Sequence, residues 1–376
     1  MKKTIATCLL LIMQLGLFIQ AQESPTTDIF QQGQDGYACF RIPAIVQSKA
    51  GTLLAFAEAR KNSCSDTGNI DLVVKRSEDG GKTWSKAITV WDDGDNVCGN
   101  PAPIVDQETG RIILVACHNL GEDHEKEIID RTSKDSRRIY VLHSDNDGKS
   151  WSAPKDITSS VKRPDWTWYA TGPCHGIQLQ HKKYKGRLVV SANHMVANTK
   201  TYHSQLIYSD DKGETWKLGG VVSQHGGNES SVVELKNGDL MLNMRNYNRE
   251  ESKSRSYAIS RDGGETVSDM QYLPELIEPV CQGSTLNYMK NNKVSSNILF
   301  SNPASTDKRE KMTVKLSEDN GKTWPYACLI YAGPSAYSDL VNLPDGNIGL
   351  LYEYGTNNPY EKIGFTVIPF AKLKGR

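Results

Sequence analysis

Short runs of consecutive apolar residues recur along the chain, and most of them follow a glycine. With that glycine included, the runs span residues 51–56, 110–115, 186–190, 238–242 and 346–351, and a variant without it spans 297–300. Unbroken apolar runs of this length are typical of strands that are covered on both faces. Other stretches, such as 70–76 and 138–143, alternate between apolar and polar residues and are typical of strands covered on one face. The pattern predicts six buried strands with less buried strands beside them.

A second repeat, Ser-x-Asp-x-Gly-x-Thr-Trp, lies between these runs. It is complete at 77–84, 209–216 and 317–324, and it is weaker at 144–151, where Asn146 replaces the Asp, and at 260–267, where Val267 replaces the Trp. The Asp can accept hydrogen bonds from the turn, the Gly can adopt the left-handed conformation, and the Trp supplies a large apolar body. Each copy therefore predicts a self-satisfied hairpin turn with its own small core. We interpret these boxes as scaffold rather than as a site.

The two repeats together predict an all-β chain. Six buried strands, five of them followed by a strand that ends in a box hairpin, describe six four-stranded sheets around an axis, which is a six-bladed β-propeller with Asp-box hairpin turns. We expect a single domain over residues 22–376, in which the segment near Asp28 to Phe30 joins the last sheet and closes the ring. The polar stretch 121–138 is interpreted as a solvated insertion in the second unit, without a function.

The N-terminal 21 residues have the pattern of a secretory leader. A basic start at Lys2 and Lys3 precedes an apolar run from Ile5 to Ile19, and the small residue Ala21 offers a cleavage site. An uncleaved anchor is the alternative, although the run is shorter than the roughly 20 residues that a membrane span needs. We therefore expect export to the periplasm or to the outside of the cell, with no stable membrane span in the mature chain.

Composition and cysteine content narrow the class of partner. The 376 residues are 38% hydrophobic and 23% charged, and 44 Lys and Arg balance 44 Asp and Glu. This balance gives no basic surplus that would indicate a nucleic-acid partner. Seven of the eight cysteines follow the predicted leader, at positions 39, 64, 98, 117, 174, 281 and 328. Their spacing fits neither a zinc site nor a small disulfide framework, so we favour scattered buried thiols over the alternative of one or two disulfides.

Four arginines stand where chain segments enter or leave the predicted inner strands. Arg60 and Arg245 end apolar runs, Arg309 follows one by a short loop, and Arg41 precedes one. A lone arginine at a strand end is usually a solvated charge. Four at equivalent places in a ring would converge on one mouth of the central channel and would repel one another without an anion among them. Arginine offers a carboxylate a planar pair of donors, so the arrangement predicts a carboxylate ligand.

The segment Phe40-Arg41-Ile42-Pro43 resembles the Arg-Ile-Pro motif of sialidases, and the five boxes resemble the Asp-boxes of the same family. The segments Asn243-Met244-Arg245 and Ala336-Tyr337-Ser338-Asp339-Leu340 add to a likeness that covers about residues 33–354. The resemblance implies a bacterial-type exo-sialidase, or neuraminidase, which is a glycoside hydrolase that removes terminal sialic acids from glycoproteins, glycolipids or oligosaccharides. It implies no cofactor and no metal. The oligomeric state does not follow from the sequence.

The resemblance also implies roles for individual residues. The catalytic residues would be Asp66 as general acid and base, Glu229 as the base that pairs with the nucleophile, and Tyr337 as the nucleophile. The substrate-binding residues would be Arg41, Arg245 and Arg309, which would hold the sialic acid carboxylate, and Arg60, which would lie near the substituents of the sugar.

The reacting sugar explains why a tyrosine suits the nucleophile position. Sialic acid carries a carboxylate on its anomeric carbon, so an attacking carboxylate would meet a like charge, with a repulsion on the order of 4 kcal/mol at about 4 Å and an effective dielectric near 20. A neutral phenol avoids this repulsion but needs a neighbouring base. Two alternatives remain open at this point: a trans-sialidase or intramolecular trans-sialidase on the same fold, and a propeller that binds sialoglycans without cleaving them.

Overall fold

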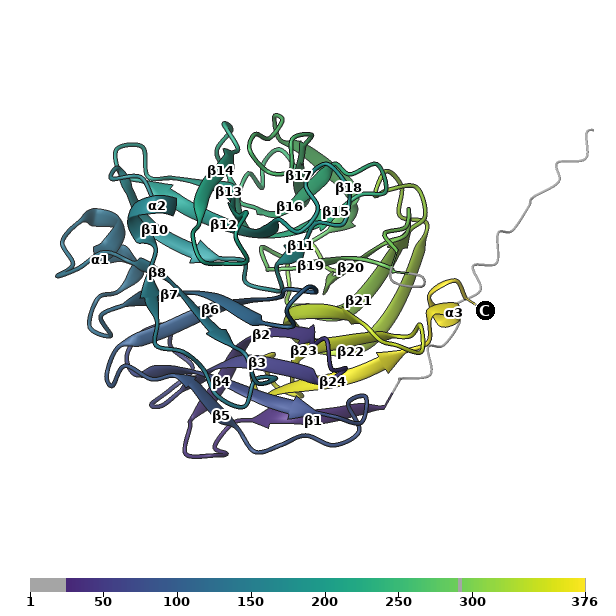
Figure 1. The fold of residues 1–376 in the computed structure, drawn as a ribbon, viewed down its shortest axis with the longest axis horizontal. Helices are drawn as coiled ribbons and strands as arrows, with labels where there is room; N and C mark the ends of the chain where they lie inside the picture. Colours follow the sequence, from purple (N-terminus) through teal and green to yellow (C-terminus); the bar gives the residue numbers. More distant parts are fainter. Residues whose placement is uncertain (1–24, 290–292, 376) are drawn as a thin grey trace, which may run out of the picture.

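A computed structural model describes residues 25–289 and 293–375 of the chain. The predicted leader at 1–21 lies outside these residues. The described part is built almost wholly from antiparallel strands, which follow one another around a central axis as six blades (Figure 1). The sequence-based prediction of a six-bladed β-propeller is confirmed.

The first three blades take their strands in chain order from the axis outwards. Blade 1 consists of β2 (Cys39–Gln47), β3 (Leu53–Arg60), β4 (Ile70–Ser77) and β5 (Ile88–Trp91). Blade 2 consists of β6 (Val97–Val105), β7 (Ile112–Asn119), β8 (Arg138–Ser144) and β9 (Lys155–Asp156). Blade 3 consists of β10 (Trp166–Thr171), β12 (Leu188–Val196), β13 (Thr201–Ser209) and β14 (Lys217–Val221), with β11 (Ile177–Gln178) paired to β12.

The other three blades complete the ring. Blade 4 consists of β15 (Gly227–Glu234), β16 (Leu240–Asn246), β17 (Ser254–Ser260) and β18 (Gln271–Ile277). Blade 5 consists of β19 (Ser284–Asn287), β20 (Ile298–Pro303), β21 (Glu310–Ser317) and the first half of β22 (Tyr326–Asn342). Blade 6 consists of the second half of β22 with β23 (Ile348–Tyr354), β24 (Lys362–Ile368) and β1 (Thr26–Gln31). Three short helices, α1 (Glu125–Asp130), α2 (Thr158–Val161) and α3 (Phe370–Leu373), occur in the described residues.

Strand β1 closes the ring from the opposite end of the chain. It pairs antiparallel with β24, with Thr26 opposite Thr366 and Phe30 opposite Ile363. Figure 1 shows this N-terminal strand lying beside the C-terminal strand in blade 6. The pairing covers what would otherwise be the open edge of the last strand. The prediction that the segment near Asp28 to Phe30 completes the last sheet is confirmed.

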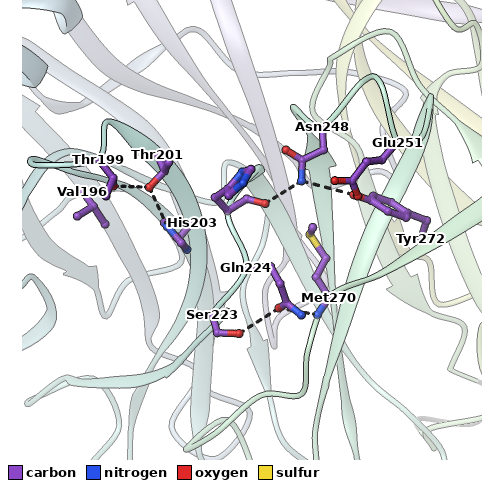
Figure 2. Close-up of a pocket in the computed structure, with 11 residues that line it drawn as sticks. Val196, Thr199, Thr201, His203, Ser223, Gln224, Asn248, Glu251, Met270 and Tyr272 are labelled. Atoms are coloured by element: carbon purple, nitrogen blue, oxygen red, sulfur yellow. Dashed lines mark hydrogen bonds between the residues drawn. The ribbon is translucent and has the colours of Figure 1, made fainter.

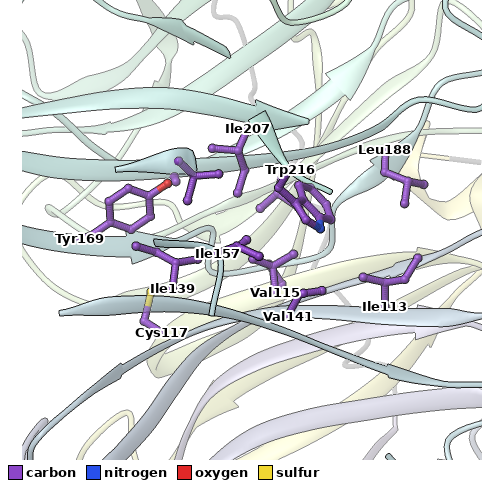
Figure 3. Packing of buried hydrophobic residues seen from close by; sticks show 14 of the residues in the cluster. Ile113, Val115, Cys117, Ile139, Val141, Ile157, Tyr169, Leu188, Ile207 and Trp216 are labelled. Carbon is purple, nitrogen blue, oxygen red and sulfur yellow. The ribbon is translucent and has the colours of Figure 1, made fainter. Parts of the chain in front are cut away.

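The hydrophobic core is divided among the interfaces between neighbouring blades. Figure 3 shows the interface of blades 2 and 3, where Val115 and Val141 face Leu188 and Ile207. Trp216, from the Asp-box that follows β13, lies in this interface with only 2% of its surface exposed. The prediction that each box holds its own small core is therefore wrong. A tight turn has too little apolar surface to cover an indole, so the ring packs on the preceding blade.

The polar half of each box is self-satisfied, as predicted. In the copy after β13, Ser209 Oγ donates to Asp211 Oδ1 at 2.8 Å, and the Thr215 N–H donates to the same oxygen at 2.8 Å. Thr215 Oγ1 donates to Asp211 Oδ2 at 2.6 Å, and Trp216 Nε1 donates to the Gly213 carbonyl at 3.1 Å. Because the carboxylate is fully used inside its own turn, it has no capacity left for chemistry.

Among the residues that the structure describes, one disulfide joins Cys39 to Cys64, and five cysteines are buried free thiols at positions 98, 117, 174, 281 and 328. The expectation of scattered thiols is therefore wrong for the first two and confirmed for the five. The strand register explains the pairing. Cys39 lies opposite Arg60 in the β2–β3 hairpin, which brings the chain just beyond β3 back to the start of β2. Spacing along the sequence does not reveal this register.

Across residues 25–289 and 293–375, no helix has both the length and the apolar character that crossing a membrane requires.

Candidate active site

The predicted site residues meet at one mouth of the ring, where the chain bulges out of the inner strands. The strand register shifts between Arg41 and Ala44 in β2, between Gly227 and Ser230 in β15, and between Ser335 and Ser338 in β22. A bulge bends the strand and re-aims the side chains within it, and bulges are common beside active sites. The first shift starts at Arg41, and the other two enclose Glu229 and Tyr337.

Tyr337 and Glu229 form a buried hydrogen-bonded pair. The Tyr337 hydroxyl lies 2.6 Å from Glu229 Oε1 and 2.8 Å from Oε2, although the two residues are 108 positions apart in sequence. Arg245 NH1 donates to Glu229 Oε2 at 2.6 Å and lies 3.3 Å from the Tyr337 hydroxyl. The phenol therefore has an acceptor for its proton and a cation beside its oxygen.

Burial and the charge of Glu229 together raise the pKa of Tyr337 well above its usual value. The guanidiniums of Arg245, Arg309 and Arg41 lower this pKa, but they do not outweigh burial and the charge of Glu229. The group at rest is a neutral phenol. Deprotonation must therefore accompany bond formation, and the hydrogen-bonded Glu229 is placed to take the proton.

Arg41 is held by Glu353, a fully buried carboxylate that the sequence reasoning missed. Arg41 Nε and NH2 donate to the two oxygens of Glu353 at 3.1 and 3.2 Å. The same oxygens accept the backbone N–H of Ile42 at 2.9 Å and that of Tyr337 at 3.0 Å. Ile42 has φ 58°, which is costly for a β-branched residue, so its N–H bond to Glu353 helps to hold the bulge. One carboxylate thus fixes both Arg41 and the backbone of Tyr337.

Arg309 reaches the same place from the loop before β21. Its NH1 donates to Tyr360 Oη at 2.9 Å and its NH2 donates to the Val280 carbonyl at 3.0 Å. The Cζ of Arg309 lies 5.6 Å from the centre of the Tyr337 ring, and the Cζ of Arg41 lies 5.1 Å from it. Three guanidiniums, from Arg41, Arg245 and Arg309, therefore lie around one tyrosine.

Asp66 lies beside Arg41, in the loop 61–69 that leaves β3. Its carboxylate is 73% exposed and lies 2.7 Å from Arg60 NH2 and 3.7 Å from Arg41 NH1. Partial desolvation by the surrounding protein opposes ionisation of this exposed carboxylate, but the charges of Arg60 and Arg41 outweigh it and lower the pKa of Asp66. Arg60 itself is 2% exposed and is held by Glu58, whose Oε2 accepts its Nε and NH2 at 3.1 and 2.6 Å.

The insertion 121–138 is largely exposed, as the interpretation of a solvated segment predicts, but its helix also contacts residues of the candidate site, which that interpretation did not expect. Its helix α1 carries Glu125, which accepts a hydrogen bond from the Tyr202 hydroxyl. The Tyr202 ring stacks on Tyr247 at 5.2 Å, and the Tyr247 hydroxyl accepts from Arg245 NH2 at 2.8 Å. Glu125 is exposed, but the protein around its carboxylate partly desolvates it and raises its pKa, and the charges of Asp66 and Glu229 act in the same direction. The side chains of Glu125, Tyr202 and Tyr247 form a wall between α1 and Arg245.

The sequence contains a signal for the missed carboxylates. Glu353 and Glu58 are single acidic residues inside otherwise apolar strands, in Leu351-Tyr352-Glu353-Tyr354 and Ala57-Glu58-Ala59-Arg60. A charge in the middle of a buried strand is costly unless it is paired, so its presence indicates a buried cation or several N–H donors nearby. The sequence does not say which partner it meets.

An open groove of about 650 Å³ lies between blades 3 and 4 (Figure 2). It adjoins the wall through Thr201, His203 and Asn248, which are the sequence neighbours of Tyr202 and Tyr247. None of the seven predicted site residues lines it. Among the described residues, no group of three or more His, Cys, Asp or Glu side chains is arranged to hold a metal ion.

Comparison with known proteins identifies what this arrangement resembles. A family described as BNR repeat-like domain matches residues 51–350. The chain is 34% identical to a sialidase of Bacteroides fragilis over 85% of its own length and 61% of the relative. It is 31% identical to a sialidase of Micromonospora viridifaciens over 89% of its own length and 52% of the relative. The chain therefore spans only 61% and 52% of these two relatives. A solved structure, "Hadza microbial sialidase Hz136", has a TM-score of 0.81 at 30% identity, covering 93% of this chain and 69% of that one.

Proposed function

Because the chain belongs to the BNR-repeat sialidase family, we propose that it is an exo-α-sialidase that hydrolyses terminal sialic acids from glycoproteins, glycolipids or oligosaccharides. The observation that carries the proposal is the Tyr337 hydroxyl, which lies 2.6 Å from Glu229 with three guanidiniums around it. A phenol with a base, in a cationic pocket, suits attack on a sugar that bears a carboxylate at its reacting carbon.

The arginines bind and orient the substrate. Arg41, Arg245 and Arg309 take the sialic acid carboxylate, and each charge-assisted contact contributes roughly 1.5 to 3 kcal/mol. Without substrate, Arg41 NH1 lies 3.7 Å from Asp66 Oδ1, so the carboxylate of the substrate competes with Asp66 for that donor. The charge that the substrate brings then raises the pKa of Asp66. Substrate binding therefore favours the protonated form that a general acid requires.

The reaction proceeds in two displacements. In the first, the Tyr337 oxygen attacks the anomeric carbon while its proton passes to Glu229, and Asp66 gives its proton to the departing glycan oxygen. In the second, the Asp66 carboxylate takes a proton from water, the water oxygen attacks the anomeric carbon, and Tyr337 leaves with a proton from Glu229. Two inversions give net retention. Sialidases with a tyrosine are a recognised exception among retaining glycosidases, which otherwise use a carboxylate nucleophile.

Two further proposals follow from the N-terminus and from the site. We propose that residues 1–21 direct export, so that the enzyme acts in the periplasm or outside the cell. A propeller that only binds sialoglycans would have no need for Asp66, Glu229 and Tyr337 together, and the presence of all three favours the enzyme over the binding module. Transfer of the sugar to another acceptor, or to its own hydroxyl, would use the same intermediate.

Product analysis tests the proposal. We expect NMR spectra recorded during turnover of α2,3- and α2,6-linked sialyllactose to show α-sialic acid as the first product, and Tyr337→Phe to release none. Appearance of the β-anomer as the first product would contradict retention. Formation of an anhydro sugar or of a new sialoside would show that the enzyme transfers the sugar instead of hydrolysing the substrate. Undiminished release by Tyr337→Phe would overturn the assignment of the nucleophile.

A further inference from the structure

The loop 61–69, which carries Asp66, has almost no packing of its own. Every residue from Lys61 to Asn69 is exposed or half-buried, in a region where the flanking strands β3 and β4 are buried. Its ends are fixed by backbone bonds, from Lys61 N–H to the Asn69 carbonyl at 3.0 Å and from Gly68 N–H to the Gly121 carbonyl at 2.9 Å. Between Lys61 and Gly68, no side chain of the loop is buried in the apolar core.

Arg60 makes two non-covalent contacts with the middle of this loop, and the reaction disturbs one of them. Arg60 NH1 donates to the Cys64 carbonyl at 2.6 Å, and Arg60 NH2 pairs with the Asp66 carboxylate at 2.7 Å. The second contact depends on the negative charge of Asp66. A general acid must be protonated, so the ion pair is lost in the form of the enzyme that donates the proton.

The disulfide is a covalent anchor at the same place. Cys64 is two residues before Asp66, and its partner Cys39 is the first residue of β2, two residues before Arg41. Cys39 is fully buried and lies opposite Arg60 across the β2–β3 ladder. The bond therefore joins the middle of an exposed loop to the strand that presents the substrate-binding Arg41. Unlike the ion pair, it does not change with the charge of Asp66.

We propose that the Cys39–Cys64 disulfide is the positioning element for Asp66, keeping the carboxyl group over the leaving oxygen when its ion pair is lost. The proposal rests on the proposed function, in which Asp66 is the general acid. Full activity on natural glycans then requires an oxidising compartment, which agrees with the proposed export.

The test uses the double variant Cys39→Ser/Cys64→Ser and two substrates with different leaving groups. Sialyllactose has a poor leaving group that needs protonation, whereas a 4-nitrophenyl sialoside departs without much help. A correctly placed general acid contributes about 10²- to 10⁴-fold, so we expect kcat/KM for sialyllactose to fall about 10- to 100-fold and that for the aryl sialoside by less than about 3-fold. A merely structural role would lower both values together.

Two control variants make the outcome specific. Cys328→Ser removes a buried thiol of blade 5 and should leave kcat/KM for both substrates unchanged. Asp66→Asn should show the same split as the disulfide variant, which is a large fall in kcat/KM for sialyllactose and a small fall for the aryl sialoside. The fall for sialyllactose should be larger than in the disulfide variant. If the double variant does not fold, reduction of the folded wild-type enzyme with a phosphine gives the same comparison, and the reduced enzyme should show the split.

The outcomes separate this inference from the proposed function. No turnover by the wild-type enzyme would overturn the proposed function itself. Equal losses on both substrates in Asp66→Asn would overturn the assignment of the acid. If Asp66→Asn shows the split but the disulfide variant, or the reduced enzyme, loses both activities equally or neither, the positioning role of the disulfide is wrong.

Discussion

Replacement of Glu353 by Gln tests how far one buried carboxylate supports the site. Each of its oxygens accepts two donors: Oε1 accepts Arg41 Nε and the Ile42 N–H, and Oε2 accepts Arg41 NH2 and the Tyr337 N–H. A glutamine has the same shape but carries an NH2 group in place of one oxygen. In either orientation that group faces two N–H donors, so two of the four hydrogen bonds are lost.

The size of the effect follows from burial. Glu353 is fully buried, so the N–H groups left without acceptors have no water to turn to. Each buried unsatisfied donor costs about 1–3 kcal/mol, and removal of one partner of a buried ion pair costs about 3–5 kcal/mol. Because these two costs overlap at Arg41, we expect Glu353→Gln to lower the free energy of unfolding by about 3 kcal/mol or more.

Glu353→Gln should lower the affinity for sialic acid by a smaller free energy than it lowers the stability of the fold. Without Glu353 the charge of Arg41 is less neutralised, which favours binding of an anion, but the side chain is no longer held in place. We expect the second effect to dominate and the affinity for sialic acid to fall about 10-fold, which corresponds to about 1.4 kcal/mol.

Thermal denaturation and a titration with sialic acid measure these two effects. The matched control is Glu78→Gln, which removes an exposed carboxylate from its pair with Arg76. We expect the control to change the melting temperature little, since exposed pairs contribute about 0–1 kcal/mol. A Glu353→Gln variant as stable as the control would refute the reasoning that Glu353 holds the site together.

Three further predictions concern the acid, the boxes and the blade interfaces. Arg60→Gln removes a charge that lowers the pKa of Asp66. Activity is lost as pH rises through that pKa, so the alkaline limb of kcat/KM should move to higher pH. The shift should be up to about 0.7 unit, since a pair with one exposed partner contributes up to about 1 kcal/mol. A limb that stays in place in the pH profile would count against Asp66 as the acid. Hydrogen bonds from its own turn lower the pKa of Asp79 to about 2, so its contribution to stability is present above the unfolded value of about 3.9 and is lost as pH falls towards 2. Acid titration followed by circular dichroism should show a shallower loss of stability over that range in Asp79→Ala, and an unchanged slope would contradict this. Trp216→Ala should cost about 3–5 kcal/mol in urea denaturation, and the half-buried Trp84→Ala should cost less; equal losses would contradict the role of burial between blades.

Local patterns were sufficient to predict the repeated parts of the fold. A strand that is buried on both faces must be apolar throughout, and a box turn must contain residues that satisfy its own hydrogen bonds. Both constraints act within about ten residues, so the six blades and the box turns could be predicted from the sequence. Ring closure by β1 followed because the last unit had no other strand for its outer edge.

Contacts across the ring could not be predicted in the same way. Glu353 is 312 residues from Arg41, and its role depends on how blade 6 meets blade 1. The disulfide depends on the register of one hairpin, and the wall that contains Glu125 depends on where a polar insertion folds back. These contacts are set by packing between blades or by strand register, and short sequence patterns encode neither. The motifs predicted Asp66, Glu229 and Tyr337 as catalytic residues, but they did not predict the residues that contact them, such as Glu353.

Trapping of the glycosyl-enzyme is the most direct test of the nucleophile. A 2,3-difluorinated sialic acid should react with the enzyme and then hydrolyse slowly, because the fluorine beside the anomeric carbon disfavours the cationic transition state of both steps. Peptide mass spectrometry should then find the sugar on Tyr337, and the Tyr337→Phe variant should remain unlabelled. A label on Asp66 or Glu229, or turnover of sialyllactose by an enzyme that never acquires a label, would contradict the tyrosine mechanism.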